Sequence, residues 1–379
     1  MKYALLITQR CNLSCDYCYI SKARSTMDIS MAEKAIDYIF THSVEGEEIN
    51  IGFFGGEPLL VFERLQEITF LIERHSYFSK RKVDLQVTTN GTIFNDDIAG
   101  FLSDHKIGLG ISCDGTSSVQ NLFRKFKNGK PSSYVVENNM IKAVKKFPGL
   151  MVNMVFTPLT YRSLPESLDY LYSLGIRRIF VNPDFSASWD ISDSFGINEV
   201  YNEIGQKYVM WYKQSDPSFV SIIDGKMIVI LNNGYRSEEK CHMGKKEFAI
   251  SPNGNIFPCE RLVGDGSENP HCIGNIVKGI DYSSFCNSKN FSKSNFSVCH
   301  DCALRNFCMN WCGCSNYFSS GSYSQVGPFI CASEKAAIRT AFEVFQELEA
   351  LYGASVIQRI VGVKCNPHLF VVDQENINP

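Results

Sequence analysis

The chain carries almost no net charge and no run of charges of one sign. Its 379 residues include 37 Lys and Arg against 40 Asp and Glu, which leaves a formal charge of −3. A groove for nucleic acid or a membrane-binding surface would need a clear excess of basic residues. The composition therefore indicates neither partner, and a protein or small-molecule substrate is expected instead.

Long apolar runs are also missing. The apolar stretch 3–7 meets Arg10 and Cys11 at once and is too short for the hydrophobic region of a secretory signal peptide. No other run reaches the length that spans a bilayer. The hydrophobic fraction of 44% is nevertheless ample for buried cores. We therefore expect a globular, cytoplasmic protein.

Cysteine, by contrast, is abundant, with 15 residues. Because cytosolic proteins keep their thiols reduced, clustered cysteines indicate metal binding more than disulfides. Three of them lie within the first eighteen residues and eleven follow position 240, while the long middle holds only Cys113. Cys113 itself is expected to be a buried core thiol, since lone cysteines on apolar strands usually behave as small hydrophobic residues.

The first half of the chain alternates β-rich runs with amphipathic stretches, which is typical of a parallel sheet with crossover helices. Functional groups gather at the C-terminal ends of the strands in such folds. The first helix is expected to open with a capping box formed by Ser30 and Glu33. Strands are expected at 3–8, 49–54, 83–88, 107–112, 151–156 and 177–181, and helices around 65–72, 136–144, 164–174 and 197–214.

The amino-acid composition of the second half changes from Cys241 onwards. Short segments rich in Gly, Asn, Ser and Cys follow a mixed connector at 215–233, and bound metal would have to organise them. A helix over 332–351 then presents Ile338, Phe342, Phe345 and Leu348 on one face and stops at Gly353. The expected domains are a barrel at 1–220, a cysteine-rich domain at 221–335, and a C-terminal helix and tail at 336–379.

Cys11, Cys15 and Cys18 form a C-x3-C-x2-C motif directly after the first predicted strand. Three thiolates on one loop can hold three irons of a cubane cluster and leave the fourth iron open. An open metal position is what a catalytic cluster needs. On its own the spacing is equally compatible with a zinc loop or with coincidence.

The motifs that follow favour a catalytic cluster over a zinc loop, because their order along the chain resembles that of a known family. An aromatic residue, Tyr17, precedes the third cysteine, and Gly55-Gly56-Glu57-Pro58, Thr88-Thr89-Asn90-Gly91-Thr92 and Ser112-Cys113-Asp114-Gly115 end three successive predicted strands. Together they resemble the radical S-adenosylmethionine (SAM) superfamily, although Cys113 replaces the usual Leu. The resemblance implies an α/β fold with a partial (β/α)6 TIM-like barrel and a SAM-cleaving [4Fe–4S] cluster. It also implies that SAM contacts come from Tyr17, Gly55, Gly56, Glu57, Pro58, Thr89, Asn90, Ser112 and Arg124.

The second cysteine array reads Cys241-x12-Gly254-x4-Cys259, then Cys299-x2-Cys302-x5-Cys308-x3-Cys312, then Cys331. It resembles the SPASM domain, an iron–sulfur extension of radical SAM enzymes that act on peptides and proteins. A zinc ribbon is the alternative for the two central cysteine pairs alone. The resemblance implies two auxiliary clusters, with Cys299, Cys302, Cys308 and Cys331 on the outer one and Cys241, Cys259 and Cys312 on the inner one.

The inner cluster is then one ligand short. Cys272, Cys286 and Cys314 are candidates, although Cys286 and Cys314, like Cys365 in the tail, are more readily explained as bystanders. Otherwise the open iron would bind a substrate cysteine, as is proposed for relatives that form thioethers.

Glu260 follows Cys259 at a position where sulfatase-maturing relatives carry a catalytic Asp. A carboxylate there could act as a general base if its pKa were raised. An ordinary ion pair, with Arg261 for example, is the simpler explanation of an acidic loop residue.

These features predict a radical SAM enzyme that modifies a ribosomally made peptide by forming a thioether or a carbon crosslink, or by an oxidation. The alternatives are an anaerobic sulfatase maturase and a zinc-stabilised interaction module. The expected partners are the peptide or protein substrate and an electron donor such as a flavodoxin or ferredoxin. No leader-recognition domain is expected before the barrel, since the first predicted strand begins at about residue 3.

Overall fold

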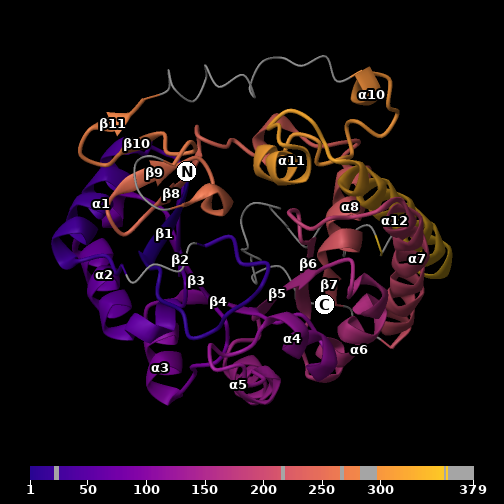
Figure 1. Cartoon of the computed structure of the whole chain (residues 1–379), viewed down its shortest axis with the longest axis horizontal. Helices are drawn as coiled ribbons and strands as arrows, with labels where there is room; N and C mark the ends of the chain where they lie inside the picture. Colours follow the sequence, from indigo (N-terminus) through magenta and orange to yellow (C-terminus); the bar gives the residue numbers. More distant parts are fainter. Residues whose placement is uncertain (21–24, 215–217, 265–268, 282–296, 354–355, 357–379) are drawn as a thin grey trace. The chain divides into compact units, whose positions relative to one another are not determined.

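The computed structural model describes residues 1–20, 25–214, 218–264, 269–281, 297–353 and 356 (Figure 1). The chain divides into two compact units, and each unit contains parallel strands connected by helices. The first unit consists of 1–113, 120–150 and 242–289, and the second of 114–119, 151–241 and 290–379.

The sheet of the first unit follows the order β11-β10-β9-β8-β1-β2-β3-β4. Strands β1 to β4 run parallel, and β8 extends the sheet by pairing in parallel with β1. The carboxyl ends of β1 to β4 therefore meet at one edge of this sheet. The strand bounds are β1 (Lys2–Thr8), β2 (Ile49–Gly55), β3 (Val83–Thr89), β4 (Ile107–Ser112), β8 (Glu247–Ile250), β9 (Asn255–Phe257), β10 (Gly274–Asn275) and β11 (Gly279–Ile280).

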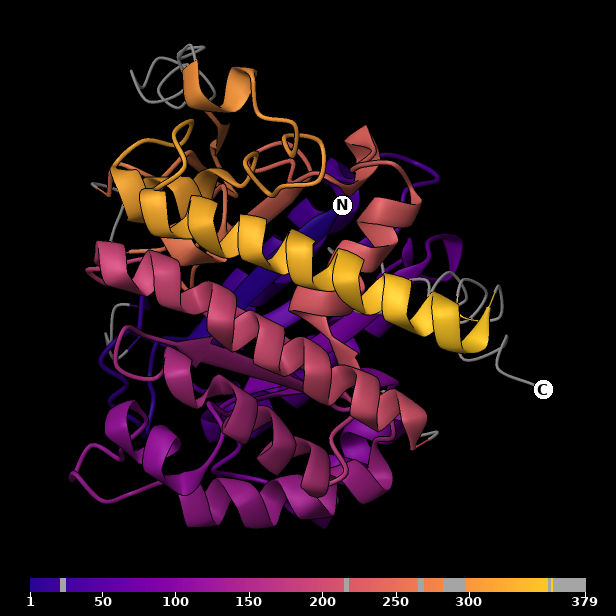
Figure 2. The same cartoon turned by 90° about the vertical axis from the view of Figure 1, so that its right-hand side faces the viewer.

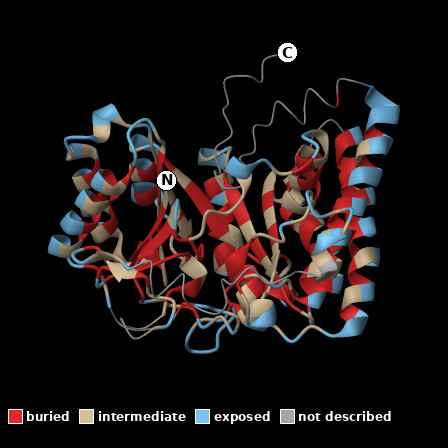
Figure 3. Ribbon diagram, turned by 90° about the horizontal axis from the view of Figure 1, so that it is seen from above, coloured by how far each residue is buried: buried red, intermediate tan, exposed pale blue. Residues whose placement is uncertain are grey.

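Helices connect these strands and bury one apolar face each, while their outer faces are exposed (Figure 3). The first of them begins at Ile29 and not at the expected capping box of Ser30 and Glu33, because the Asp28 side chain accepts the Met31 N–H and caps the helix two residues earlier. The helix bounds are α1 (Ile29–His42), α2 (Phe62–Arg74), α3 (Asp96–Asp104), α4 (Ser117–Phe123) and α5 (Ser133–Lys146).

The second unit contains three parallel strands in the order β5-β6-β7. Two long helices, α7 and α12, lie side by side (Figure 2). A buried hydrogen bond of 2.9 Å between the Tyr201 and Ser333 hydroxyls joins them. The element bounds are β5 (Met151–Phe156), β6 (Arg178–Pro183), β7 (Phe219–Val220), α6 (Leu164–Ser173), α7 (Ile191–Lys213), α8 (Ser221–Leu231), α10 (Ser297–His300), α11 (Gly313–Ser320) and α12 (Pro328–Tyr352).

All six predicted strands are confirmed to within two residues at each end. Two predictions for the second unit need correction. The connector contains helix α8, whose first turn is held by Asp224, because this buried side chain accepts the Val220 N–H and the Tyr208 hydroxyl at 2.7 Å each. On α12, the predicted Ile338 and Leu348 are buried, but Phe342 is 47% exposed, and Ala341 and Val344 complete the buried face.

In the described part of the chain, no helix is both long and apolar enough to cross a membrane.

Candidate functional site

The cysteine loop of the first unit leaves the carboxyl end of β1 and is held against residues 125–127. The Ser14 N–H donates to the Lys125 carbonyl at 2.8 Å, and the Lys127 N–H donates to the Asn12 carbonyl at 3.1 Å. Leu13 is fully buried, so the loop is anchored between its first two cysteines. This anchoring leaves Cys11 and Cys15 half-buried and Cys18 exposed.

Two glycines bring the end of β2 directly against this loop. The Gly56 N–H donates to the Thr8 carbonyl and the Glu57 N–H to the Arg10 carbonyl, each at 2.8 Å. Gly55 has a φ of +131°, and a Cβ atom added to it would lie 2.0 Å from the Thr8 carbonyl oxygen. A Cβ on Gly56 would lie 2.2 Å from the Arg10 carbonyl oxygen. Only residues without a side chain fit this approach.

Glu57 is fully buried and links the end of β2 to the end of β3. Its Oε1 accepts from the Leu59 N–H at 3.0 Å and from the Thr89 hydroxyl at 2.8 Å, and its Oε2 accepts from the Asn90 N–H at 2.6 Å. Burial raises the pKa of this carboxyl to about 7 despite these three hydrogen bonds. The carboxyl therefore holds the Thr89–Asn90 segment in place and keeps about one acceptor position for a further donor.

Asn90 connects that segment to the cysteine loop. Its side-chain N–H group lies 3.7 Å from the Cys11 sulfur and donates to the Asn12 side-chain oxygen at 2.8 Å. The Asn90 oxygen in turn accepts from the Thr92 hydroxyl at 2.6 Å. Burial raises the pKa of the Cys11 thiol, while this contact and the Leu13 N–H oppose the shift.

Within the cysteine loop, Tyr17 packs against Phe123, the last residue of α4, and against Arg124, which follows it. The Arg124 guanidinium lies 5.4 Å from the centre of the Tyr17 ring, and the Phe123 ring lies 5.8 Å from it. Arg124 is only 7% exposed, so this cation–π contact is largely shielded from water. Tyr17 and Arg124, which the sequence singled out separately, therefore form one contact.

The segment after β4 is divided between the two units. Ser112 ends the strand and is half-buried, and Cys113 is 2% exposed, as expected of a core thiol. In the second unit, the Asp114 side chain accepts the Val155 N–H at 3.1 Å. A Cβ on Gly115, whose φ is +118°, would lie 2.2 Å from the Ser167 side chain. Asp114 and Gly115 thus serve local packing.

Cys259 and Glu260 follow β9 in the first unit and lie beside the segment that leaves the cysteine loop. Ile20 packs in one buried cluster with Phe257 and Val263, which flank Cys259 closely in sequence. The region after Cys18 and the region around Cys259 therefore form a common neighbourhood.

The charge state of Glu260 follows from its surroundings. Burial alone would favour the neutral acid, but Lys2 and Arg261 outweigh it and lower the pKa of the carboxyl. The Cys259 sulfur lies 3.6 Å from its Oε2 atom. The raised pKa expected for a general base is thus not what the structure indicates, and Glu260 is an anion at neutral pH.

In the second unit, Cys331 at the start of α12 joins three cysteines of the preceding segment, and together they line one cavity: Cys299, Cys302, Cys308 and Cys331. Arg305 and Lys335 line the same cavity and supply two positive charges. Burial raises the pKa of the Cys331 thiol, and Lys335 opposes the shift. Among the described residues, no three Cys, His, Asp or Glu side chains converge on a position for a single metal ion.

The remaining cysteines are distributed over both units. Cys312 caps α11, and its sulfur lies 3.7 Å from that of Cys314, with both side chains buried. Cys241 is half-buried in the second unit, whereas Cys259 and Cys272 belong to the first. Cys286 and Cys365 lie outside the described residues.

The sequence pattern did not single out two features that the structure shows. Asn12 bonds to both Asn90 and Thr92, and nothing in its sequence context indicates this. Lys226 is 4% exposed and pairs with Glu334. The ion pair could have been anticipated from Lys226 alone, which lies among apolar residues of α8, because a buried lysine requires a partner.

The chain is similar in sequence to several known proteins. Residues 5–171 match the family model of the radical SAM superfamily. The uncharacterized protein MJ0907 of Methanocaldococcus jannaschii is 33% identical over 284 residues, which cover 73% of this chain and 89% of that protein. The cysteine-type anaerobic sulfatase-maturating enzyme of Clostridium novyi is 26% identical over 332 residues, covering 80% and 83% of the two chains.

Solved structures show the same fold. Native anSMEcpe with bound AdoMet matches with a TM-score of 0.77 at 21% identity, covering 92% of this chain and 99% of that one. Its form with bound AdoMet and Cp18Cys peptide gives 0.76 at 21% identity, with coverage of 93% and 100%. The predicted α/β fold class is thereby confirmed.

The chain belongs to the radical SAM superfamily. It is an enzyme related to sulfatase maturases, and its cofactors include SAM and a [4Fe–4S] cluster.

Proposed function

We propose that this enzyme modifies a ribosomally made peptide, by forming a thioether or a carbon crosslink or by an oxidation. The observation that carries the proposal is the cavity lined by Cys299, Cys302, Cys308 and Cys331, because a cysteine-rich extension of this pattern resembles the SPASM domain of peptide-modifying enzymes. A relative named for maturing sulfatases and a similar structure that holds a peptide point to the same substrate class.

Cys11, Cys15 and Cys18 would hold the SAM-binding cluster. They are three cysteines on one anchored loop, which fits a cubane with one open iron. When bound, the cluster and SAM would supply the radical chemistry, namely reductive cleavage of SAM to a 5′-deoxyadenosyl radical that would abstract hydrogen from the substrate. The protein's own contribution is to bind, orient and shield these groups.

The residues around the loop would bind and orient SAM. Gly55 and Gly56 bring the end of β2 against Thr8 and Arg10, directly before the cysteine loop, and Pro58 begins the short helical turn that follows. The remaining acceptor position of Glu57 suits an ammonium group. Thr89, Asn90, Ser112, Tyr17 and Arg124 complete the set of proposed contacts.

Two auxiliary clusters complete the proposal. Each iron of a cubane takes one thiolate, so four thiols spread around a cavity fit it better than thiols that converge on one point. The positive charges of Arg305 and Lys335 would offset the negative charge of such a cluster. Cys241, Cys259 and Cys312 would hold the inner cluster, with Cys314 or Cys272 or a substrate thiol as its fourth ligand.

Glu260 is proposed as the general base that takes a proton from the substrate after hydrogen abstraction. Its lowered pKa keeps the carboxyl ionised at neutral pH, so it can accept a proton, although as a weaker base than a carboxylate with a raised pKa. In a Glu260→Gln variant we expect SAM cleavage to continue while product formation falls by at least about tenfold. Arg261→Gln is the matched control, and an equal loss in both variants would assign Glu260 to an ordinary ion pair.

The central experiment measures 5′-deoxyadenosine formed by the anaerobically reconstituted protein with SAM and a one-electron reductant. Cys15→Ala should abolish the product, and Cys113→Ala, the same substitution at a buried core thiol, should not. Roughly eight to twelve irons per chain are expected with the auxiliary clusters and about four without them. A flavodoxin or ferredoxin should replace the chemical reductant.

Formylglycine formation is the second candidate, favoured by the 26% identity to the Clostridium novyi sulfatase-maturating enzyme over 80% of this chain. A hydrazide probe distinguishes the two reactions, because it labels the aldehyde of formylglycine and leaves a crosslink unlabelled. The peptides to test are a precursor encoded beside this gene and a sulfatase-derived peptide with the target Cys or Ser. Labelling of the sulfatase peptide alone would replace the first proposal with the second.

A further inference from the structure

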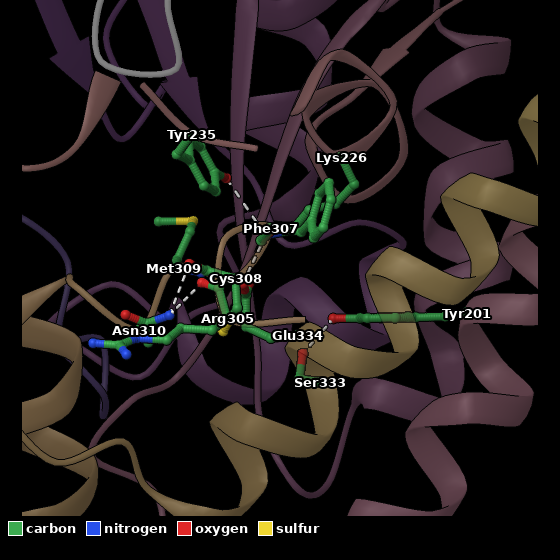
Figure 4. A network of polar contacts seen from close by, with 10 residues as sticks. All are labelled: Tyr201, Lys226, Tyr235, Arg305, Phe307, Cys308, Met309, Asn310, Ser333 and Glu334. Carbon is green, nitrogen blue, oxygen red and sulfur yellow. Dashed lines mark hydrogen bonds and ion pairs between the residues drawn. The ribbon is translucent and has the colours of Figure 1, made fainter. Parts of the chain in front are cut away.

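A buried ion pair between Lys226 and Glu334 lies near Cys308, one of the residues that line the four-cysteine cavity of the second unit (Figure 4). The Lys226 ammonium on α8 lies 2.6 Å from the Glu334 carboxylate on α12. Their side chains are 5% and 15% exposed. Burying two charges costs several kcal/mol of desolvation per ion, which the attraction between them barely repays. An apolar pair would stabilise the fold about as well, so the charges call for another explanation.

Both partners hold the residues on either side of Cys308. The Glu334 Oε2 atom accepts the Met309 N–H at 2.6 Å, and the Lys226 ammonium donates to the Phe307 carbonyl at 3.4 Å. Lys226 also donates to the Tyr235 hydroxyl at 3.4 Å and lies 5.5 Å from the centre of that ring. The backbone before and after Cys308 is thus fixed by opposite charges from two different helices.

The Cys308 side chain lies between the two backbone groups that these charges hold, since Phe307 precedes it and Met309 follows it. Glu334 lies three residues after Cys331 on α12, one helical turn away, and Lys335 beside it lines the cavity. The pair is therefore coupled to two of the four cavity cysteines.

We infer that Lys226 and Glu334 are positioning residues for the outer auxiliary cluster: they hold Cys308 at the cavity, and their balanced charges set the reduction potential of the cluster. This inference rests on the proposed cluster at Cys299, Cys302, Cys308 and Cys331. Reduction adds one negative charge, so a nearby cation favours it and a nearby anion opposes it.

The test is a redox titration of reconstituted Lys226→Met, Glu334→Gln and the double variant, followed by electron paramagnetic resonance. Lys226→Met leaves an unpaired carboxylate and should lower the midpoint potential of one cluster. Glu334→Gln leaves an unpaired ammonium and should raise the potential of the same cluster. The double variant is neutral again and should return towards the wild-type value. Shifts of the same sign in both single variants, or none, would overturn the inference.

Matched controls come from an exposed ion pair that also includes a residue of α12. Lys213 and Glu347 form an ion pair of 3.1 Å between α7 and α12, with side chains about half exposed. Lys213→Met and Glu347→Gln should leave all cluster potentials unchanged, because solvent screens these charges. Potentials that move equally in these variants would show a general charge effect and would contradict a specific role of Lys226 and Glu334.

A second measurement uses the metal-free protein and so does not depend on cluster loading. Alkylation of each cysteine, followed by peptide mass mapping, should be at least fivefold faster at Cys308 in Glu334→Gln and unchanged at Cys299. A uniform increase at all cysteines would show that the pair merely stabilises the fold, which contradicts positioning. Failure of the cluster proposal is separate, because Cys308→Ala would then leave the iron content unchanged.

Discussion

The side-chain N–H group of Asn90 lies 3.7 Å from the sulfur of Cys11, so the end of β3 touches the cysteine loop that follows β1. A hydrogen bond to a thiolate contributes about 1.5 to 3 kcal/mol. Asn90→Ala should therefore lower the rate of SAM cleavage by roughly 10- to 100-fold. The measurement is 5′-deoxyadenosine formation at equal iron content, and a rate within about twofold of wild type would show that this contact has no role.

The close contact of Gly55 and Gly56 with the Thr8 and Arg10 carbonyl oxygens gives a prediction about stability. Gly55→Ala and Gly56→Ala each force a Cβ atom to within 2.0 to 2.2 Å of a carbonyl oxygen. We expect each to lower the free energy of unfolding by about 1 to 3 kcal/mol and to abolish cluster loading. Gly100→Ala is the matched control, since α3 leaves open space there and the change should stabilise the protein by about 0.5 to 1 kcal/mol.

Glu57 predicts a pH dependence of stability. Its pKa of about 7 in the folded chain lies above the ordinary value of 4.5, so its stabilising contribution is complete below pH 4.5 and is lost as the pH rises through 7. The loss amounts to about 3 kcal/mol. Denaturation of the metal-free protein from pH 5 to 8 should show this decline in wild type. In Glu57→Gln the decline in the free energy of unfolding should be smaller by about 3 kcal/mol. Parallel stability curves for the variant and the wild type would refute the raised pKa of Glu57.

The contact between Arg124 and Tyr17 should affect SAM cleavage through the geometry of the cysteine loop. Arg124→Ala removes a shielded cation–π contact worth about 1 to 2 kcal/mol, so we expect a decrease of roughly 5- to 30-fold in the rate. Arg124→Lys should recover only part of it, because an ammonium does not stack on a ring as a planar guanidinium does. The exposed neighbour Lys125→Ala should be near wild type, and an equal decrease there would contradict the role of Arg124.

Local sequence patterns were sufficient to predict the six strands and to identify the cysteine motifs. The six strands are apolar and bounded by turn residues, and their periodicity is encoded in adjacent residues. Helix ends were less predictable, because a cap depends on which side chain reaches the N–H groups. Asp28 takes that place on α1, and Asp224 starts a helix in a segment whose β-branched residues do not favour one.

The sequence by itself determined the family, the α/β fold and the spacing of the cysteine loop, since all of these are written in short runs of residues. Only the tertiary structure decided that Glu57 would hold Asn90, that Asn90 would reach Cys11, and that Lys226 would meet Glu334 across 108 residues of chain. Such contacts depend on burial and on the meeting of distant elements, and no local pattern encodes either of them.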